Sequence, residues 1–162
     1  MISIPRRHAL LLCFCALAAC SNASPHYTQP ASIQSVEIPL HPNETLALRA
    51  SINHWADHYE VPRTLVHRLA IRESTHNPEA RNGPYYGLLQ ILPQTARGMG
   101  FQGQPTDLLD ADTNLKYAVK YLRGAWMLSD GSQYTAVKWY SRGYYYEAKR
   151  RGLLVETGLR KG

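Results

Sequence analysis

Apolar residues recur at intervals of three and four from residue 43 onward, and proline or glycine separates the successive runs. The clearest run places Leu65, Val66, Leu69 and Ala70 on one side of a helix. No convincing stretch alternates apolar and polar residues with the period of two that a half-buried strand requires. With 162 residues, the chain is long enough for one compact core. We therefore expect a mostly α fold with a single helical domain.

Caps and helix breakers predict where the helices begin and end. Asn43 is the expected cap of a first helix, which ends before Val61-Pro62. A second helix starts at Pro62 and stops at Asn77-Pro78, because the residue before a proline disfavours helical angles. The apolar side expected for the first helix contains Leu46, Ala50, Trp55 and Tyr59. Later helices are expected to start at Pro93, at an Asp112 cap, at a Ser132 cap and beyond Arg142.

The first 19 residues have the composition of a secretion signal. Arg6 and Arg7 precede an apolar or small run over residues 9–19, which is too short to span a bilayer because a helix needs about 20 residues for that. Residues 17–20, Leu-Ala-Ala-Cys, resemble the bacterial lipoprotein box. The resemblance implies that Cys20 is lipidated and begins the mature protein. An ordinary signal peptide cut nearby, which would leave Cys20 as a free thiol, is the alternative.

Residues 20–42 are expected to form a lipid-anchored, proline-rich tether, and residues 43–162 the folded domain. Ser21 implies, by analogy with lipoproteins of this kind, an outer-membrane location facing the periplasm. Loss of residues 1–19 removes two arginines and no acid, so the formal net charge falls from +6 to +4. This mild basic excess suits an anionic polymer such as cell wall, and we expect no nucleic acid partner.

Glu73 continues the apolar series of Leu65 and Leu69 at the end of the second predicted helix. A carboxyl group is costly to bury, and burial raises its pKa toward the range in which a general acid works. Glu73 is therefore the leading candidate for acid and base catalysis. The competing interpretation is an exposed glutamate at a fraying helix end, paired with Arg72 or Arg68.

A second catalytic carboxylate is not evident, although most glycosidases use two. The other candidates lie at predicted helix ends, in loops or at caps: Asp57, Glu60, Glu79, Asp107, Asp110 and Asp112. A single buried acid is sufficient only if the substrate supplies its own nucleophile.

The residues around Glu73 resemble the catalytic segment of soluble-lytic-transglycosylase-like (SLT) domains. Four blocks follow one another in the order of that family, over roughly residues 45–150. They are Arg72-Glu73-Ser74 with Asn77-Pro78 and Ala80; Gly87-Leu88-Leu89-Gln90-Ile91 with Pro93-Gln94-Thr95-Ala96; Asn114-Leu115 with Ala118 and Tyr121-Leu122; and Trp139-Tyr140-Ser141-Arg142-Gly143. An isolated Glu-Ser pair would be uninformative, whereas four ordered blocks are a specific signal.

The resemblance implies a lysozyme-like helical fold that cleaves the MurNAc–GlcNAc bond of peptidoglycan. In this family the 6-hydroxyl of the muramic acid attacks, so the product is a 1,6-anhydromuramyl sugar and one catalytic acid/base is enough. Glu73 corresponds to that acid/base. The expected partners are glycan strands and, through the lipid anchor, a membrane; no cofactor is implied.

Six further positions correspond to residues that line the cleft or bind substrate: Ser74, Gly87, Leu88, Gln90, Tyr140 and Ser141. Ser74 is expected to orient the substrate or the acid, and Gly87 to let the glycan approach. The Gln90 amide would hydrogen-bond the glycan, and the Tyr140 hydroxyl would position Glu73. Ser141 replaces the asparagine usual in the family, and Leu89 replaces a methionine of similar volume.

Other residue patterns leave alternatives open. His54 and His58 are four residues apart and His67 and His76 follow, but neither an HExxH pattern nor a third ligand is evident, so we expect no metal site. The tyrosines at 85, 86 and 144–146 could stack on sugars or pack the edges of the core. Two other functions also fit the sequence: lysozyme-type hydrolysis of the same bond, and a non-catalytic peptidoglycan-binding lipoprotein.

Overall fold

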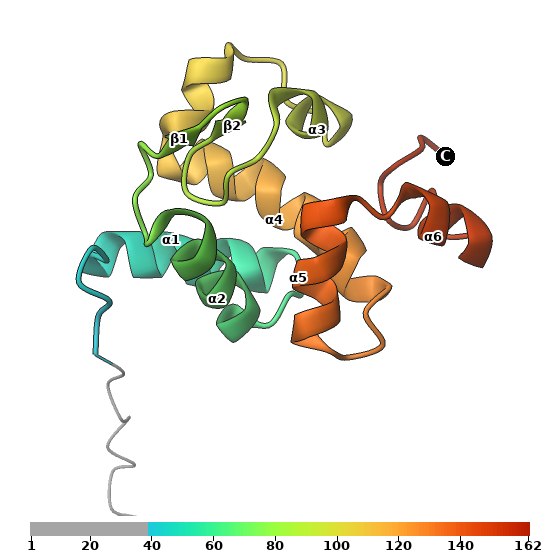
Figure 1. Cartoon of the computed structure of the whole chain (residues 1–162), viewed down its shortest axis with the longest axis horizontal. Helices are drawn as coiled ribbons and strands as arrows, with labels where there is room; N and C mark the ends of the chain where they lie inside the picture. Colours follow the sequence, from blue (N-terminus) through green and yellow to red (C-terminus); the bar gives the residue numbers. More distant parts are fainter. Residues whose placement is uncertain (1–38) are drawn as a thin grey trace, which may run out of the picture. The chain divides into compact units, whose positions relative to one another are not determined.

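The computed structural model describes residues 39–162 and shows a mostly helical domain, which confirms the predicted fold class (Figure 1). The predicted signal peptide, the lipidation at Cys20 and the tether up to residue 38 lie outside the described residues. The helices are α1 (Leu46–His58), α2 (Arg63–Ser74), α3 (Pro93–Gly98), α4 (Ala111–Met127), α5 (Gln133–Arg142) and α6 (Tyr145–Arg151), with a 3₁₀ helix, η1 (Pro105–Leu109). In this part of the chain no helix is both long and apolar enough to cross a bilayer.

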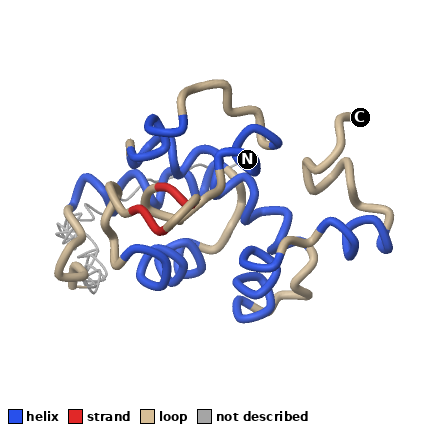
Figure 2. The backbone as a smooth tube through the Cα atoms, turned by 45° about the horizontal axis from the view of Figure 1, so that its top comes forward, coloured by secondary structure: helices blue, strands red, loops and turns tan. Residues whose placement is uncertain are grey.

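A short β-hairpin follows α2. β1 (Arg81–Asn82) pairs antiparallel with β2 (Tyr85–Tyr86), and the turn between them contains Gly83 at a φ of 56°. Figure 2 shows the hairpin surrounded by helical segments. Periodicity did not predict these strands, because two residues are too few to establish an alternation.

The start and the buried face of α1 differ from the prediction. Thr45 caps the helix, since its hydroxyl accepts a hydrogen bond from the Leu48 N–H at 3.1 Å. The Asn43 side chain instead donates to the Thr75 carbonyl at 3.1 Å, and this tertiary contact joins the segment before α1 to the end of α2. The buried face consists of Leu48, Ile52 and Ala56, whereas Leu46 is exposed.

The cap of α4 is Asp110, where Asp112 was predicted. Asp110 accepts from the Thr113 N–H at 2.8 Å. Asp112 accepts from the Ser51 hydroxyl at 2.8 Å and from the Trp55 indole N–H at 2.7 Å, so it connects α4 to α1. The starts predicted at Pro62, Pro93 and Ser132 are confirmed to within one residue, and α6 is the expected last helix.

The core of the domain is built around α4. α4 packs against α1, α3, α5 and η1, and Figure 1 shows it running through the middle of the domain. The buried apolar residues of α4 are Leu115, Ala118, Val119, Leu122 and Ala125. On α2, the predicted residues Leu65, Val66, Leu69 and Ala70 are all buried, so the helical face that leads to Glu73 faces the core as expected.

Candidate active site

Glu73 lies in the last turn of α2, at the edge of the core. Thr75 ends the helix in the left-handed conformation, with a φ of 55°. The Glu73 side chain is 22% exposed, and its Oε1 lies 3.4 Å from Nε of Arg72. Burial raises the pKa of Glu73 above its ordinary value, and the Arg72 guanidinium opposes part of that rise. Both interpretations of Glu73 therefore hold in part, because the carboxyl is half-buried and also has a cationic neighbour.

Glu73 opens into a cleft formed by two adjoining cavities of about 280 and 300 Å³. The two cavities share Tyr85, Gln90, Tyr140 and Ser141 as lining residues. The first also contains Arg72, Glu73 and Asn82, and the second continues past Thr95, Tyr121 and Arg142. We refer to the two together as the Glu73 cleft.

No other carboxylate lines the Glu73 cleft within residues 39–162. Glu79 is an exposed loop residue, and Asp110 and Asp112 are engaged in the cap and the α1 contact described above. Asp107 accepts from the backbone of Gln104 at the start of η1. The cleft therefore contains a single acid surrounded by hydroxyl, amide and guanidinium groups.

One wall of the cleft is the segment of residues 86–91, in which Tyr86 ends β2 and the buried residues 87–90 form no helix or strand. Its polar backbone groups need partners, because an unpaired buried N–H or C=O group is costly. The Ser74 hydroxyl donates to the Leu88 carbonyl at 2.7 Å, and the Tyr140 hydroxyl donates to the Leu89 carbonyl at 2.9 Å. Side chains from α2 and α5 thus hold this wall from two sides.

Asn114 of α4 holds the same wall from a third side. Its side chain is fully buried, and its Oδ1 accepts from the Leu89 N–H at 2.9 Å. Its Nδ2 donates to the carbonyls of Tyr86 and Leu108, both at 2.9 Å. The sequence interpretation quoted Asn114 within a family block but did not identify it as a site residue. The sequence signal that could have identified it is an amide side chain on an otherwise apolar helical face.

Gln90 serves the wall and also borders the cleft. Its Nε2 donates to the carbonyls of Ala80 at 2.9 Å and Gly87 at 2.8 Å, while its Oε1 is buried without a hydrogen-bond partner in the described residues. Its backbone has a φ of 47°, a conformation unusual for a residue with a side chain. The expected hydrogen bond of Gln90 to glycan stays a prediction, and Oε1 is the side-chain atom that has no other partner in the described residues.

Gly87 is required for the packing of the cleft wall, which is a reason that the sequence did not suggest. A Cβ atom on it would lie 2.1 Å from the Leu108 carbonyl oxygen and 2.3 Å from Nδ2 of Asn114. The small size of Gly87 therefore lets the wall pack against η1 and α4, behind the cleft. Approach of the glycan, the reason expected from the sequence, stays untested.

The remaining predicted site residues take different places. The Leu88 side chain is fully buried in the core and does not line the cleft. Ser141 is exposed and lines the cleft, with its hydroxyl donating to the Val137 carbonyl at 2.9 Å. Tyr140 is buried beside Glu73, and burial together with the Glu73 charge raises the pKa of its hydroxyl well above the ordinary value. Its proton is donated to Leu89, so Tyr140 offers Glu73 only an acceptor oxygen.

The tyrosines divide between the two roles that the sequence left open. Tyr85 is 40% exposed and lines the cleft, where its ring is available to a sugar. Tyr144 is a core residue whose hydroxyl donates to the Tyr121 carbonyl at 2.8 Å. The sequence interpretation did not identify Arg72, Asn82 and Tyr121 as cleft residues.

The family model for the transglycosylase SLT domain matches residues 50–151, which include Glu73, the 86–91 wall, Asn114 and Tyr140. The chain belongs to the transglycosylase SLT family. The SLT domain gives the fold as lysozyme-like, as the sequence predicted, and the activity as lytic-transglycosylase-type action on peptidoglycan. No curated protein and no solved structure matches the chain.

Replacing Gly87 with Ala should strongly destabilise this SLT domain, because the new Cβ meets backbone and a buried amide at less than 2.5 Å. We expect a loss of several kcal/mol, on the order of 3 or more, in the free energy of unfolding measured with urea. Gly83→Ala is the matched control: its φ is also positive, at 56°, but nothing lies within 4 Å of the added atom. It should cost only about 1–2 kcal/mol, from the backbone conformation alone. Equal losses in the two variants would contradict the packing role of Gly87.

Proposed function

We propose that this chain is a peptidoglycan lytic transglycosylase that cleaves the β-1,4 bond between MurNAc and GlcNAc and forms 1,6-anhydromuramyl ends, with Glu73 as its only acid/base. The observation that carries the proposal is the half-buried Glu73 in a cleft that no other described carboxylate lines. Membership of the SLT family supports peptidoglycan as the substrate.

The proposed reaction needs one proton carrier. The Glu73 carboxyl, kept protonated to a higher pH by burial, donates its proton to the glycosidic oxygen while the bond from that oxygen to C1 of MurNAc breaks. The resulting carboxylate then takes the proton of the MurNAc 6-hydroxyl as its oxygen bonds to C1. Glu73 returns to its starting state, and no water is consumed.

The surroundings of Glu73 support this use of a single residue. An inverting hydrolase places a second carboxylate to activate water, and a retaining one uses it as a nucleophile. The cleft offers neither within the described residues, whereas a nucleophile carried by the substrate requires neither. Arg72 and the acceptor oxygen of Tyr140 lie at the same cavity as Glu73. The Arg72 guanidinium favours the charged carboxylate, whereas the Tyr140 oxygen can accept a hydrogen bond only from the protonated carboxyl.

We also propose that Cys20 carries a lipid that anchors the domain to the outer membrane on its periplasmic side. The support is the Leu-Ala-Ala-Cys sequence at residues 17–20 and the serine at position 21. An enzyme held in this way would meet the glycan strands of the wall directly.

Glu73→Gln should abolish cleavage of purified peptidoglycan while binding to the insoluble polymer is retained. Glutamine keeps the shape of the side chain but cannot donate a proton as an acid, and loss of general acid catalysis costs about 10²–10⁴ in rate. Solubilisation of dye-labelled sacculi measures the rate, and co-sedimentation measures the binding.

The control for this substitution is Glu79→Gln, which removes an exposed carboxylate near the same loop. It should leave the rate unchanged. Cleavage that survives in Glu73→Gln would place the acid elsewhere, and a wild-type chain that binds sacculi without cleaving them would identify a non-catalytic binding lipoprotein.

The pH dependence of cleavage should move upward when Arg72 is replaced by Gln. Glu73 must be protonated to donate, so the rate falls as pH rises through its pKa; Arg72 lowers that pKa, and its removal lets the pKa rise. Because the Arg72 side chain is 53% exposed, solvent screens its interaction with Glu73, so the upward shift of the pH profile should be small.

Arg68→Gln, one turn earlier on α2, is the matched control. It should not change the pH at which the cleavage rate falls, which is the falling limb of the pH profile. A limb that moves to lower pH in Arg72→Gln, or that moves equally in both variants, would contradict the assignment of this limb to Glu73.

A further inference from the structure

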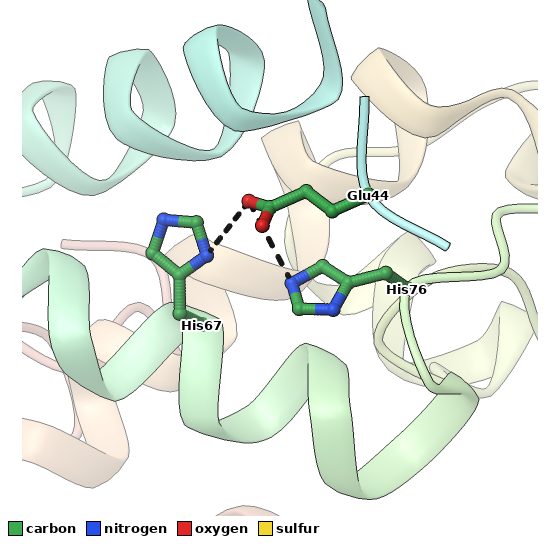
Figure 3. A group of neighbouring side chains, drawn as sticks. All are labelled: Glu44, His67 and His76. Carbon is green, nitrogen blue, oxygen red and sulfur yellow. Dashed lines mark ion pairs between the residues drawn. The ribbon is translucent and has the colours of Figure 1, made fainter. Parts of the chain in front are cut away.

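A second cluster of ionisable side chains lies apart from the lining of the Glu73 cleft, where the segment before α1 meets α2 and the turn after it. Glu44 comes from the segment before α1, His67 from α2, and His76 from the turn after α2 (Figure 3). One ligand atom from each of the three residues lies within 4.8 Å of the other two. The sequence interpretation noted both histidines but did not find Glu44, which is far from them in the chain.

Glu44 is a charged and firmly held carboxylate. Burial alone would raise its pKa, but hydrogen bonds from Arg49 and from the His41 backbone N–H outweigh burial and lower the pKa to about 2. The Oε2 atom accepts from Nη2 of Arg49 at 2.6 Å and from the His41 N–H at 3.0 Å. The Oε1 atom also contacts Nε of Arg49 at 3.0 Å, and it is the oxygen that faces both imidazole rings.

The hydrogen bond of His67 to Asn53 fixes which ring nitrogen faces Glu44. Nε2 of His67 lies 3.1 Å from Oδ1 of Asn53, which can only accept, so Nε2 carries the proton in the neutral ring. Nδ1 then presents a lone pair toward Oε1 of Glu44 across 3.4 Å. Two lone pairs at this separation repel each other unless a proton or a metal cation lies between them.

His76 presents a second ring to the same oxygen. It is 1% exposed, and neither of its ring nitrogens has a hydrogen-bond partner within residues 39–162. Its Nε2 lies 3.9 Å from Oε1 of Glu44. Thr75 and His76 both have positive φ values, 55° and 60°, so a strained turn holds the ring in this position. A buried imidazole without partners is costly, and it calls for a ligand.

We propose that Glu44, His67 and His76 bind a divalent transition-metal cation of the Zn²⁺ type, through Oε1 of Glu44, Nδ1 of His67 and Nε2 of His76. Zinc bonds imidazole nitrogen and carboxylate oxygen at about 2.0–2.2 Å, so tetrahedral ligand atoms lie roughly 3.3 Å apart. The distances from Oε1 of Glu44 to the two imidazole nitrogens, 3.4 and 3.9 Å, lie close to this value, and all three ligand atoms lie within 4.8 Å of one another.

The ligand set and its surroundings select the type of cation. Two imidazole nitrogens and one carboxylate oxygen face one another in the cluster. The hydrogen bonds of His67 to Asn53 and of Glu44 to Arg49 are of the kind that orients the ligands of a metal from behind. Because Arg49 offsets part of the Glu44 charge, the site favours imidazole-binding Zn²⁺ over Mg²⁺ or Ca²⁺, which prefer several oxygen ligands.

A cavity of about 740 Å³ gives the cation a route to the site. It is lined by all three ligands and by His41, whose ring centre lies 4.9 Å from that of His76. Nδ1 of His41 is buried without a hydrogen-bond partner in the described residues, so His41 or a water molecule from the cavity would complete the coordination. The bound cation would fasten the segment before α1 to the end of α2, next to the turn that carries Glu73.

Calorimetric titration with ZnCl₂ tests this site. The protein is the full-length chain with Cys13, Cys15 and Cys20 replaced by serine, so that no thiol competes for zinc. We expect binding of one Zn²⁺ per chain, a Zn²⁺-dependent rise in Tm that EDTA reverses, and no binding of Mg²⁺. His67→Gln and Glu44→Gln should each weaken Zn²⁺ binding by at least about 100-fold, since loss of an outer contact alone costs 10–100-fold.

The double variant His54→Gln/His58→Gln is the matched control. It removes an exposed histidine pair from α1 that could itself bind zinc, and it should leave the affinity unchanged. The imidazole ¹⁵N chemical shifts of His67 and His76 give a readout that does not depend on the stability of any variant, and Zn²⁺ should shift both. Affinity lost only in the His54/His58 variant, or unshifted His67 and His76 nitrogens, would overturn the proposal.

Discussion

The structure of the catalytic side of this domain depends on satisfying the buried backbone of residues 86–91. Tyr86 ends β2, but residues 87–90 form no helix or strand, so the N–H and C=O groups that the local turns leave unpaired need partners elsewhere. Ser74, Asn114 and Tyr140 supply them from three different helices, and Gln90 supplies more from within the segment. The hydrogen bonds require the three helices to converge on one short piece of chain, which fixes the cleft wall relative to α2.

The convergence of these three helices also positions Glu73, the proposed acid. Ser74 directly follows Glu73, so the bond from Ser74 to Leu88 sets the last turn of α2 against the wall. Tyr140, which lines the same cavity as Glu73, is held by the carbonyl of Leu89. The acid is thus half-buried between a rigid wall and α5, where desolvation raises its pKa and solvent-exposed Arg72 restrains the rise. Ser74, Gln90 and Tyr140, which the family resemblance implies for substrate binding, also make hydrogen bonds that hold the wall.

Local sequence predicted the helices, the α2 face and the placement of Glu73, because apolar spacing and proline positions encode them directly. It misplaced the caps of α1 and α4, since Asn43 and Thr45, or Asp110 and Asp112, are all residue types that cap helices and tertiary contacts decide between them. The role of Asn114 and the reason for Gly87 depend on contacts between residues that are distant in the chain. Glu44 was missed for the same reason, because nothing near it in sequence marks it as a neighbour of His67 and His76.

The central claim is that Glu73 works alone because the nucleophile belongs to the substrate. Digestion of sacculi in H₂¹⁸O, followed by mass spectrometry of the released muropeptides, tests this most directly. The account predicts anhydromuramyl ends, each lighter by one water than a reducing end, with no ¹⁸O incorporated during cleavage. Reducing ends that carry ¹⁸O, in amounts that follow the wild-type rate and disappear in Glu73→Gln, would contradict it and identify a lysozyme-type hydrolase.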